Sequence, residues 1–442
     1  MTVSRYPAYR QSGIEWIGYI PHGWKILPIM ALAGEVDQRN VGLTSTNLLS
    51  LSYGRIVLKD MASNDGLLPE SFETYQILEP NDIILRLTDL QNDKRSLRTA
   101  RCTYAGIITS AYLALRPSRI ESRFLAHLLH SYDLTKVFYS MGGGLRQTMN
   151  FADVRRLPIL LPPPAEQSAI ATFLDRETGK IDALVAEQER LIALLKEKRQ
   201  AVISQAVTKG LDPNAPMKDS GVEWLGEVPA HWEVKRIKHS ASHVVDCLHT
   251  TPTYDGELAF PAIRTADVEP GRLLLDQARL VSADVYAERI QRLKPKHNDI
   301  LYSREGERFG IAALVPANVN LCLGQRMMMF RAAASFDPVF LMWVLNSNVI
   351  LQQVFASVAG ATAPHVNISD LVNFDIPVPS RSEQSAIAHF VDLKATEFDT
   401  LTWDAERATT FLRERRAALI SAAVTGKIDV RSLAAPVQER AA

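Results

Sequence analysis

The chain has 442 residues, of which 47% are hydrophobic and 22% charged, and its 49 basic and 49 acidic side chains give a formal net charge of zero. This composition is ordinary for a packed protein and excludes a mainly disordered chain, and the charge balance excludes a uniformly basic surface for gripping nucleic acid. The three cysteines, Cys102, Cys247 and Cys322, form no CxxC pair, which argues against a disulfide scaffold or a zinc ribbon.

Membrane and secretion segments are not expected. No apolar run approaches the roughly 20 residues that cross a bilayer, and the first residues of the chain lack the apolar centre of a signal peptide. Widely spaced free cysteines suit a reducing compartment. We therefore expect a soluble protein of the cytoplasm that has no membrane partner.

The first predicted domain covers residues 1–155. The segment SGIEWIGYIPHGW at residues 12–24 is followed by short β-type runs such as DIILRL and AGIITSAYLALR, which glycine, proline, asparagine and aspartate interrupt. Short apolar runs between turn residues predict strands. We expect a mixed α/β domain with curled antiparallel sheets.

The next segment, residues 156–212, is predicted to be helical. Residues 166–207 contain no proline and a single glycine, and apolar side chains recur at intervals of three and four residues, which is typical of one face of a helix. A stretch of about 28 residues from 180 to 207 spans about 42 Å at 1.5 Å per residue, long enough for a coiled coil. The side chains expected to pair this helix with its later counterpart are Ile181, Leu184, Leu191, Leu195, Phe398, Leu401 and Leu412.

The second half of the chain repeats the first. The opening segment returns as SGVEWLGEVPAHW at residues 220–232, and PPPAEQSAIATFLD at residues 162–175 returns as PSRSEQSAIAHFVD at residues 379–392. LEPNDIIL and FLAHLLHS likewise return, in the same order, as KPKHNDIL and FLMWVLNS. The repeat predicts a second domain at residues 213–372, a second helical segment at residues 373–430 and a tail at residues 431–442.

Together these elements predict an α+β chain. It is a tandem duplication of a mixed α/β domain and a long helix, and the two helices form an antiparallel coiled coil that separates the two globular domains. The second helical stripe carries the small residues Thr402, Ala405, Ala408 and Thr409, which would let the helices pack closely. The alternative, two separate helical tails, would leave apolar stripes exposed and is less favoured.

Catalytic motifs are not found. The phosphate-binding patterns GxxxxGK[ST] and GxGxxG and the zinc-protease pattern HExxH are absent. Asp219, Glu233 and Lys235 resemble a nuclease arrangement, but the first copy has no such residues, so we interpret the segment after Trp232 as an amphipathic strand. No catalytic residue is predicted.

One arrangement is compatible with a metal. His239, His243 and Cys247 stand four residues apart and would share one face of a helix, where three ligands could hold zinc. No certain fourth ligand follows, and the first copy has nothing similar. We favour packing between a helix and a loop, with no metal and no cofactor.

Candidate DNA contacts are local, because neither domain is basic in bulk: residues 1–155 carry 17 basic and 14 acidic side chains, and residues 216–371 carry 15 and 17. The candidates lie in loops at equivalent places in the two copies. Arginine, glutamine and asparagine read guanine and adenine edges, and glycine allows close backbone approach. For each loop the alternative is a merely solvated surface. The candidates are Arg86, Lys94, Arg95, Arg98, Arg101, Gly143, Arg146, Gln147, Asn150, His249, Thr250, Thr251, Tyr254, Arg264, Arg304, Arg308, Gln325, Arg326, His365 and Asn367.

The repeated segments resemble a known family. The paired EWIG…P…W and EWLG…P…W openings, the paired P…EQSAIA.F.D blocks and the helix ends QAVTKGLD and SAAVTGKID are similar to those of the specificity subunits of type I restriction–modification enzymes. DCLHTTP and NDILYSREGERFG in the second half strengthen the resemblance, which covers nearly the whole chain.

The resemblance implies a role without catalysis. Each globular domain would be a target recognition domain that reads one half of an asymmetric, bipartite sequence in double-stranded DNA. The two helical segments would set the spacer and dock two modification subunits, which bind S-adenosylmethionine and methylate adenine. Two restriction subunits would add translocation and cleavage driven by ATP and Mg²⁺. The residues expected to bind partners are Glu166, Gln167, Ile170, Phe173, Glu383, Gln384, Ile387 and Phe390.

The two copies also differ. The first has GEVDQRN where the second has the DCLHTTP loop, and Leu87 stands where the second has Arg304. The two domains should therefore recognise different sequences. Two other classes of protein stay open: a duplicated protein–protein scaffold that does not read DNA, and a stand-alone nuclease or methyltransferase of unfamiliar type.

Overall fold

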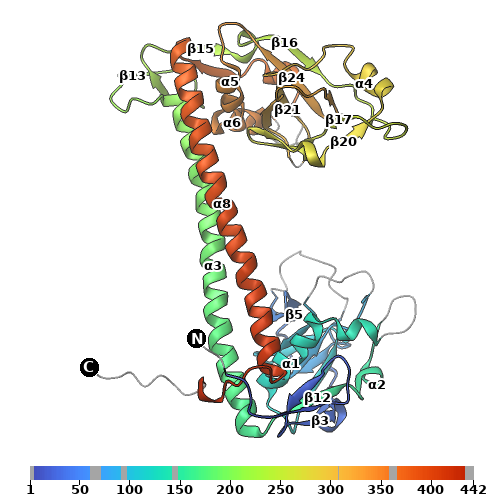
Figure 1. Cartoon of the computed structure of the whole chain (residues 1–442). Helices are drawn as coiled ribbons and strands as arrows, with labels where there is room; N and C mark the ends of the chain where they lie inside the picture. The colour runs from blue at the N-terminus through green and yellow to red at the C-terminus, as the bar shows by residue number, and fades with distance from the viewer. Residues whose placement is uncertain are drawn as a thin grey trace. The chain divides into compact units, whose positions relative to one another are not determined.

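The computed structural model describes residues 4–59, 71–90, 97–141, 148–306, 308–357 and 366–433. The chain divides into two compact units (Figure 1). The first consists of Met1–Gln188 with Arg407–Ala442, and the second of Glu189–Glu406. Each unit contains one globular part together with one half of each of two long helices, α3 (Pro164–Lys209) and α8 (Arg381–Val424).

The first unit is built from short strands, as expected from its short apolar runs. Its strands are β1 (Tyr9–Gln11), β2 (Tyr19–Pro21), β3 (Lys25–Pro28), β4 (Ala33–Glu35), β5 (Leu49–Ser52), β6 (Arg55–Leu58), β7 (Gln76–Leu78), β8 (Ile83–Leu85), β9 (Thr99–Arg101), β10 (Gly106–Ile108), β11 (Leu113–Pro117) and β12 (Pro158–Leu161). Its helices besides the long pair are α1 (Ser122–Leu134) and α2 (Phe151–Val154), with 3-10 turns η1 (Ile29–Ala31), η2 (Val137–Ser140) and η6 (Arg431–Leu433).

The centre of the first unit is a four-stranded antiparallel sheet in the order β4-β11-β8-β9. Successive side chains of each strand point to opposite faces of this sheet, and each face packs against a hydrophobic core. Ile83 and Leu85 face a core that includes Phe124 of α1. Ile84 points to the opposite face and joins a smaller core with Leu49 of β5. The continuous apolar run of β8 is therefore explained by burial on both sides.

The second unit has more elements. Its strands are β13 (Met217–Asp219), β14 (Glu227–Pro229), β15 (Glu233–Arg236), β16 (Ala241–Asp246), β17 (Phe260–Ile263), β18 (Val268–Glu269), β19 (Arg272–Leu273), β20 (Arg279–Val281), β21 (Ile300–Ser303), β22 (Ile311–Leu314), β23 (Cys322–Leu323), β24 (Met327–Ala332) and β25 (Asp375–Val378). Its further helices are α4 (Ala283–Arg289), α5 (Pro338–Leu345), α6 (Asn348–Ser357) and α7 (Ile368–Leu371), with 3-10 turns η3 (Ile237–His239), η4 (Thr265–Asp267) and η5 (Leu275–Gln277).

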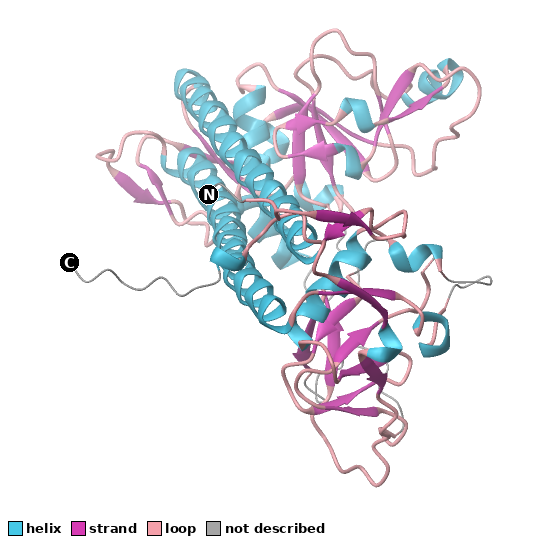
Figure 2. Cartoon of the chain, turned by 60° about the horizontal axis from the view of Figure 1, so that its bottom comes forward, coloured by secondary structure: helices cyan, strands magenta, loops and turns pink. Residues whose placement is uncertain are grey.

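The second unit repeats the sheet of the first. The order β16-β24-β21-β22 corresponds to β4-β11-β8-β9, and all its pairings are antiparallel. A three-stranded sheet, β20-β17-β23, is added, in which β17 and β23 run parallel. The strands are drawn in magenta in Figure 2. The predicted α+β class and the tandem duplication are confirmed, and the expectation of purely antiparallel sheets is wrong for this one pair.

The repeated EQ block joins each long helix to its domain. Glu166 accepts a hydrogen bond from the Trp24 Nε1 atom at 2.9 Å, and Glu383 accepts one from Trp232 Nε1 at 3.2 Å. The next residue in each copy, a glutamine, accepts a bond from the backbone N–H of the residue that caps α1 or α5. The tryptophan of the opening segment and the EQ pair are therefore parts of one joint, which explains why they are repeated together.

The role expected for this block as a partner surface is corrected for six of its eight residues. Burial inside their own unit leaves six of its residues only 0–7% exposed, because they form the joint between helix and domain: Glu166, Gln167, Ile170, Phe173, Gln384 and Ile387. Glu383 takes part in the same joint and keeps partial exposure, and Phe390 packs partly buried against the core of the second unit.

The ends of the long helices explain the repeated VTKG and VTGK segments. Gly426, after α8, has a left-handed backbone with φ of 72°, and a Cβ atom there would lie 2.4 Å from the Pro21 ring. Tyr9 donates to the Gly426 carbonyl oxygen at 3.0 Å. Gly210, after α3, has φ of 74° and packs in the same way against Trp232. Only glycine combines this conformation with such close approach.

The long helices pair in opposite directions inside each unit. In the first unit Arg416 Nε lies 2.8 Å from Asp182 Oδ1. In the second unit Arg199 Nε lies 2.9 Å from Asp399 Oδ1, and Lys196 Nζ lies 3.6 Å from Glu406 Oε1. Partners later in α3 pair with residues earlier in α8, so the predicted antiparallel pairing is confirmed.

The contact seam of the pair is narrower than predicted. Ile181 is buried, and Leu195, Phe398 and Leu412 are half-buried; within each helix the two residues lie 14 apart, which is two seven-residue repeats. Leu184, Leu191 and Leu401 are 46, 43 and 45% exposed, so their expected place in the seam is wrong. The reason is that each adjoins a seam position rather than occupying one: Val185, Ile192 and Thr402 are the half-buried neighbours.

Two sequence interpretations concerned residues 233–247. Glu233 and Lys235 lie in strand β15, as interpreted, and form an ion pair at 2.5 Å. His239 ends η3 and His243 lies in strand β16, so the expected helix face is wrong here because this segment pairs with β24. In the described part of the chain no group of three or more His, Cys, Asp or Glu side chains is placed to hold a metal.

Over the same described residues, no single helix combines the length and apolar character needed to cross a membrane. The bent pair α5 and α6 satisfies both measures only jointly. Phe340, Leu341 and Val344 of α5 are fully buried in the core of the second unit.

Candidate nucleic-acid interface

Four loop segments of the second unit meet at one end of the sheet β16-β24-β21-β22. The backbone N–H of Arg304 donates to the Arg326 carbonyl at 3.2 Å, and the N–H of Val366 donates to the Arg304 carbonyl at 3.2 Å. Thr251 Oγ1 donates to Gln325 Oε1 at 3.1 Å. The structure therefore brings together predicted DNA contacts from loops far apart in the sequence: His249, Thr250, Thr251, Arg304, Gln325, Arg326 and Asn367.

The exposed side chains of this loop cluster are polar. His249 is 64% exposed and Arg326 54% exposed, Thr250, Thr251 and Asn367 are exposed, and Gln325 is half-buried. Imidazole, guanidinium, amide and hydroxyl groups donate and accept hydrogen bonds of the kind that base edges offer in the major groove. This end of the second unit can therefore bind base edges through hydrogen bonds alone.

Arg304 is the exception in this cluster. Its side chain is only 4% exposed and lies 3.2 Å from Asp246 Oδ1 and 3.0 Å from Glu305 Oε1. The expectation that Arg304 contacts DNA is wrong, because its guanidinium is enclosed between two carboxylates.

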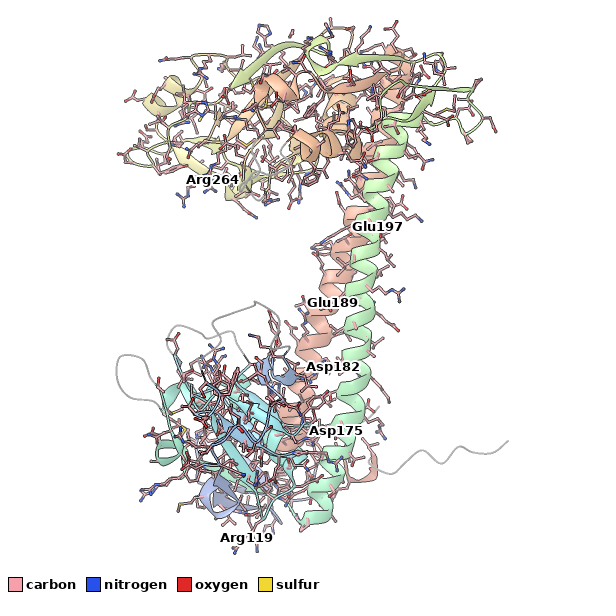
Figure 3. The ribbon with its side chains drawn as sticks, turned by 180° about the vertical axis from the view of Figure 1, so that it is seen from behind. Arg119, Asp175, Asp182, Glu189, Glu197 and Arg264 are labelled. Carbon is pink, nitrogen blue, oxygen red and sulfur yellow. The ribbon has the colours of Figure 1, made fainter. Side chains whose placement is uncertain are left out.

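Three further candidates of the second unit are occupied by protein groups. Arg264 binds both carboxylate oxygens of Asp267 at 2.9 and 2.7 Å, and this hydrogen bonding raises the pKa of the Arg264 guanidinium. Arg308 donates to the backbone carbonyls of Ala266 in η4 at 3.1 Å and of Val268 in β18 at 3.0 Å. Tyr254 lies under Arg279, whose guanidinium carbon is 5.1 Å from the ring centre. Figure 3 labels Arg264 on its unit.

Two arginines that the sequence analysis did not select shape the loop after β16. Arg289 is 8% exposed and donates to the Thr250 carbonyl at 2.6 Å and to the Leu323 carbonyl at 3.2 Å. Arg292 donates to the carbonyls of Asp246 and Cys247 at 3.2 and 3.3 Å. Nothing in the local sequence pattern distinguishes them from surface arginines, since their acceptors are backbone groups of distant loops.

The first unit offers a smaller set. Arg86 follows β8 and is half-buried, and Asn150 is exposed and caps α2 by accepting a bond from the backbone N–H of Asp153. Six predicted contacts lie outside the described residues: Lys94, Arg95, Gly143, Arg146, Gln147 and His365.

The structure corrects Arg98 and leaves Arg101 a prediction. Arg98 is fully buried, and its guanidinium donates to the carbonyls of Arg86 at 3.0 Å and Thr88 at 2.7 Å, so it shapes the loop after β8 from inside and cannot contact DNA. Arg101 is half-buried and pairs with Ile83 at the opposite end of the β8–β9 hairpin from Arg86, and its contact with DNA stays a prediction.

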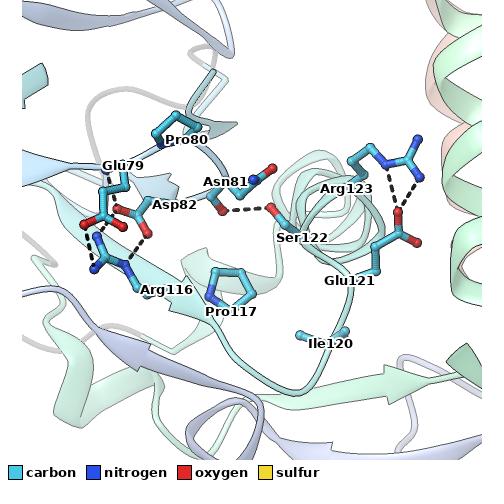
Figure 4. Close-up of a pocket in the computed structure, with 10 residues that line it drawn as sticks. All are labelled: Glu79, Pro80, Asn81, Asp82, Arg116, Pro117, Ile120, Glu121, Ser122 and Arg123. Carbon is cyan, nitrogen blue, oxygen red and sulfur yellow. Dashed lines mark hydrogen bonds and ion pairs between the residues drawn. The ribbon is translucent and has the colours of Figure 1, made fainter. Parts of the chain in front are cut away.

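The pocket of the first unit shown in Figure 4 lies over another repeated motif. Arg116 binds both carboxylate oxygens of buried Asp82 at 2.8 Å, and in the second unit Arg331 binds Asp299 at 2.8 and 2.7 Å. The repeated Asn-Asp-Ile sequence is thus explained by an internal ion pair. Since the polar side chains that line this pocket have hydrogen-bond or ion-pair partners within the first unit, we interpret it as structural.

An aspartate at the junction between α1 and α3 is also repeated in the second unit, but the two copies have different hydrogen-bond partners. Asp175 accepts hydrogen bonds from His127 at 2.8 Å and Arg123 at 3.2 Å, and lies two turns before Asp182 on α3 (Figure 3). Burial raises the pKa of Asp175, but these two partners lower it by more. Its counterpart Asp392 accepts a bond from Trp343 at 2.6 Å, and burial raises the pKa of Asp392.

The chain is similar to known restriction–modification proteins. Residues 261–400 match the family model of the type I restriction modification DNA specificity domain. The chain is 24% identical over 391 residues to the type I restriction enzyme EcoBI specificity subunit of Escherichia coli, covering 85% of this chain and 79% of the relative. It is 20% identical over 440 residues to the EcoKI specificity subunit of the same species, covering 93% and 90%.

A solved structure has the same fold. A chain from a structural study of complex assembly and conformational transition of the type I R-M system superposes with a TM-score of 0.65 at 16% identity, covering 92% of this chain and 98% of that chain. Over most of its length the chain is thus similar to the specificity subunits of type I restriction–modification enzymes, and residues 261–400 match their DNA specificity domain.

Proposed function

We propose that the chain recognises an asymmetric, bipartite sequence in double-stranded DNA, one half through each globular domain. The observation that carries this proposal is the repeated sheet with different side chains at its reading end. Arg304 with its carboxylates stands in the second unit where Leu87 stands in the first. Two domains of one fold with unlike loops would read unlike half-sites.

The proposed base and phosphate contacts are the exposed polar groups of these ends. In the second domain they are His249, Thr250, Thr251, Gln325, Arg326 and Asn367, with His365 from outside the described residues. In the first domain they are Arg86 and Asn150, together with Lys94, Arg95, Gly143, Arg146 and Gln147 from outside the described residues. Tyr254, Arg264 and Arg308 would act beside them as loop supports.

The paired helices would set the spacer and dock the partners. Their outer faces carry exposed apolar side chains that a partner could cover: Leu184, Leu191, Leu194, Leu393, Leu401, Trp403 and Phe411. We propose that two modification subunits, which bring S-adenosylmethionine, bind the chain and that two restriction subunits, which use ATP and Mg²⁺, complete the complex. The site of action would be the cytoplasm.

The test is to sequence methylated adenines in host DNA with and without this chain, in the presence of its modification subunit. We expect one bipartite sequence to become methylated only when the chain is present. A methylated sequence that does not depend on the chain would contradict the proposal.

A second measurement separates a DNA reader from a scaffold. Binding of the chain and its modification subunit to a duplex carrying the target should weaken steeply with salt, because Lys and Arg release counterions from phosphates. A scaffold that never contacts DNA would give the same result with target, scrambled duplex and no duplex.

A further inference from the structure

Arg304 connects the loops of the second domain from below their exposed surface. Its Nε atom lies 3.2 Å from Asp246, at the end of β16, and its Nη2 atom lies 3.0 Å from Glu305, in the loop after β21. Its backbone joins two further segments, through Arg326 and Val366. Residue 304 therefore contacts each segment that carries candidate DNA contacts: its 4% exposed side chain binds the two carboxylates, and its backbone joins the other two segments.

The two carboxylates that bind Arg304 also hold two exposed candidate DNA contacts, His249 and Arg326. His249 Nε2 lies 3.0 Å from Asp246 Oδ2, and its Nδ1 atom lies 3.5 Å from Arg304 Nη2. A neutral imidazole with its proton on Nε2 satisfies both contacts, since Arg304 can only donate. Arg326 Nε lies 3.7 Å from Glu305 Oε2. The directions of His249 and Arg326 thus depend on carboxylates that Arg304 also binds.

The first domain shows that the fold does not need an arginine here. Leu87 occupies the equivalent place, is 1% exposed, and its carbonyl accepts a bond from Met149 at 2.9 Å as the Arg304 carbonyl does from Val366. A buried arginine with two carboxylates has a desolvation cost that a buried leucine avoids. Stability alone therefore does not account for Arg304.

We propose that Arg304 is a positioning residue for DNA recognition by the second domain. It does not touch the duplex. By holding Asp246 and Glu305 it sets the directions of His249 and Arg326 toward the base edges of the second half-site. This inference rests on the proposed function. It attributes the sequence specificity of the second domain in part to the buried side chain of Arg304.

The test replaces Arg304 with the residue of the first domain, Arg304→Leu, in the full chain with its modification subunit. We expect at least a tenfold loss of discrimination at the second half-site in methylated host DNA, and an unchanged first half-site. Arg304→Lys should restore part of the discrimination because it keeps a charge between the carboxylates. Arg272→Leu is the matched control, since Arg272 is 71% exposed and pairs with Glu269 in the same domain, away from the candidate DNA contacts.

Thermal unfolding separates positioning from folding. If Arg304→Leu unfolds the second domain, methylation disappears altogether, and the milder Glu305→Gln takes over the test: it should relax the second half-site at an unchanged melting temperature. Variants that fold and keep full discrimination at both half-sites would overturn the inference. If the wild-type chain itself does not direct methylation, the proposed function fails instead.

Discussion

At the scale of single residues, Arg326 combines exposure with an unfavourable backbone. Its φ is 71°, in the left-handed region where a side chain costs roughly 1–2 kcal/mol. We expect Arg326→Gly to leave the stability unchanged or to raise it by up to about 1 kcal/mol, because glycine removes this strain but adds unfolded-state entropy. Binding of the complex to its target duplex should nevertheless weaken. Thermal unfolding and duplex titration check this, and unchanged binding would remove Arg326 from the interface.

A second residue-scale prediction concerns Glu383 in the joint of the second unit. Burial raises its pKa, but hydrogen bonds from His231, Ser380 and Trp232 lower it by more, to about 2. A carboxylate with a lowered pKa stabilises the folded state above its ordinary value near 4.5, and this contribution is lost as the pH falls toward 2. Glu383→Gln should therefore lower the melting temperature at pH 7 and have progressively less effect below pH 4.5. Exposed Glu223→Gln is the control, and a pH-independent difference would contradict the assignment.

At the scale of the elements, the ion pairs between the long helices are unequal. Asp182 is bound by Arg416 at 2.8 Å and by Arg55 of β6 at 2.9 Å. Asp182 and Arg416 are half-buried, whereas Arg55 is exposed. Lys196 and Glu406 are 3.6 Å apart and exposed. Asp182→Ala should cost on the order of 1–3 kcal/mol, mainly by leaving the half-buried Arg416 without its carboxylate, whereas Lys196→Ala should cost less than about 0.5 kcal/mol. Chemical unfolding of both variants measures the difference, and equal costs would be inconsistent with it.

Elements with a repeating pattern were the most predictable part of the fold. The duplication, both long helices and their antiparallel pairing follow from segments that recur in order and from a helical period. The seam itself did not follow, because a 3.6-residue stripe includes Leu184 and Leu191 while packing follows a 3.5-residue repeat. The resemblance pointed to a partner role for the EQ blocks; the joint itself was not predictable, because the hydrogen bonds to Trp24 and Trp232 join residues far apart in the sequence.

The candidate site was predictable in composition but not in arrangement. His249, Thr251, Gln325 and Arg326 were selected as polar loop residues, and the sheet register brings them together. Whether an arginine faces solvent or the inside of a loop depends on carboxylates and carbonyls in other segments. This is why Arg98 and Arg304 were expected at the surface and Arg289 was missed.

At the scale of the whole molecule, the proposed spacer function makes the helix length a measurable quantity. The ion pairs place residues 182–188 of α3 opposite residues 410–416 of α8. Inserting a second copy of each of these seven-residue segments beside the original keeps the seam in register and adds about 10.5 Å of helix. Since ten base pairs occupy about 34 Å, the spacer should grow by about three base pairs.

Both half-sites should stay the same in this doubly extended chain, because the insertion touches no loop of either globular domain. Sequencing of methylated adenines gives spacer and half-sites in one measurement. Extending only one helix is the control: it shifts the seam and should abolish methylation rather than lengthen the spacer. A doubly extended chain that methylates altered half-sites at the original spacing would show that the helices do not set the distance between the two readers.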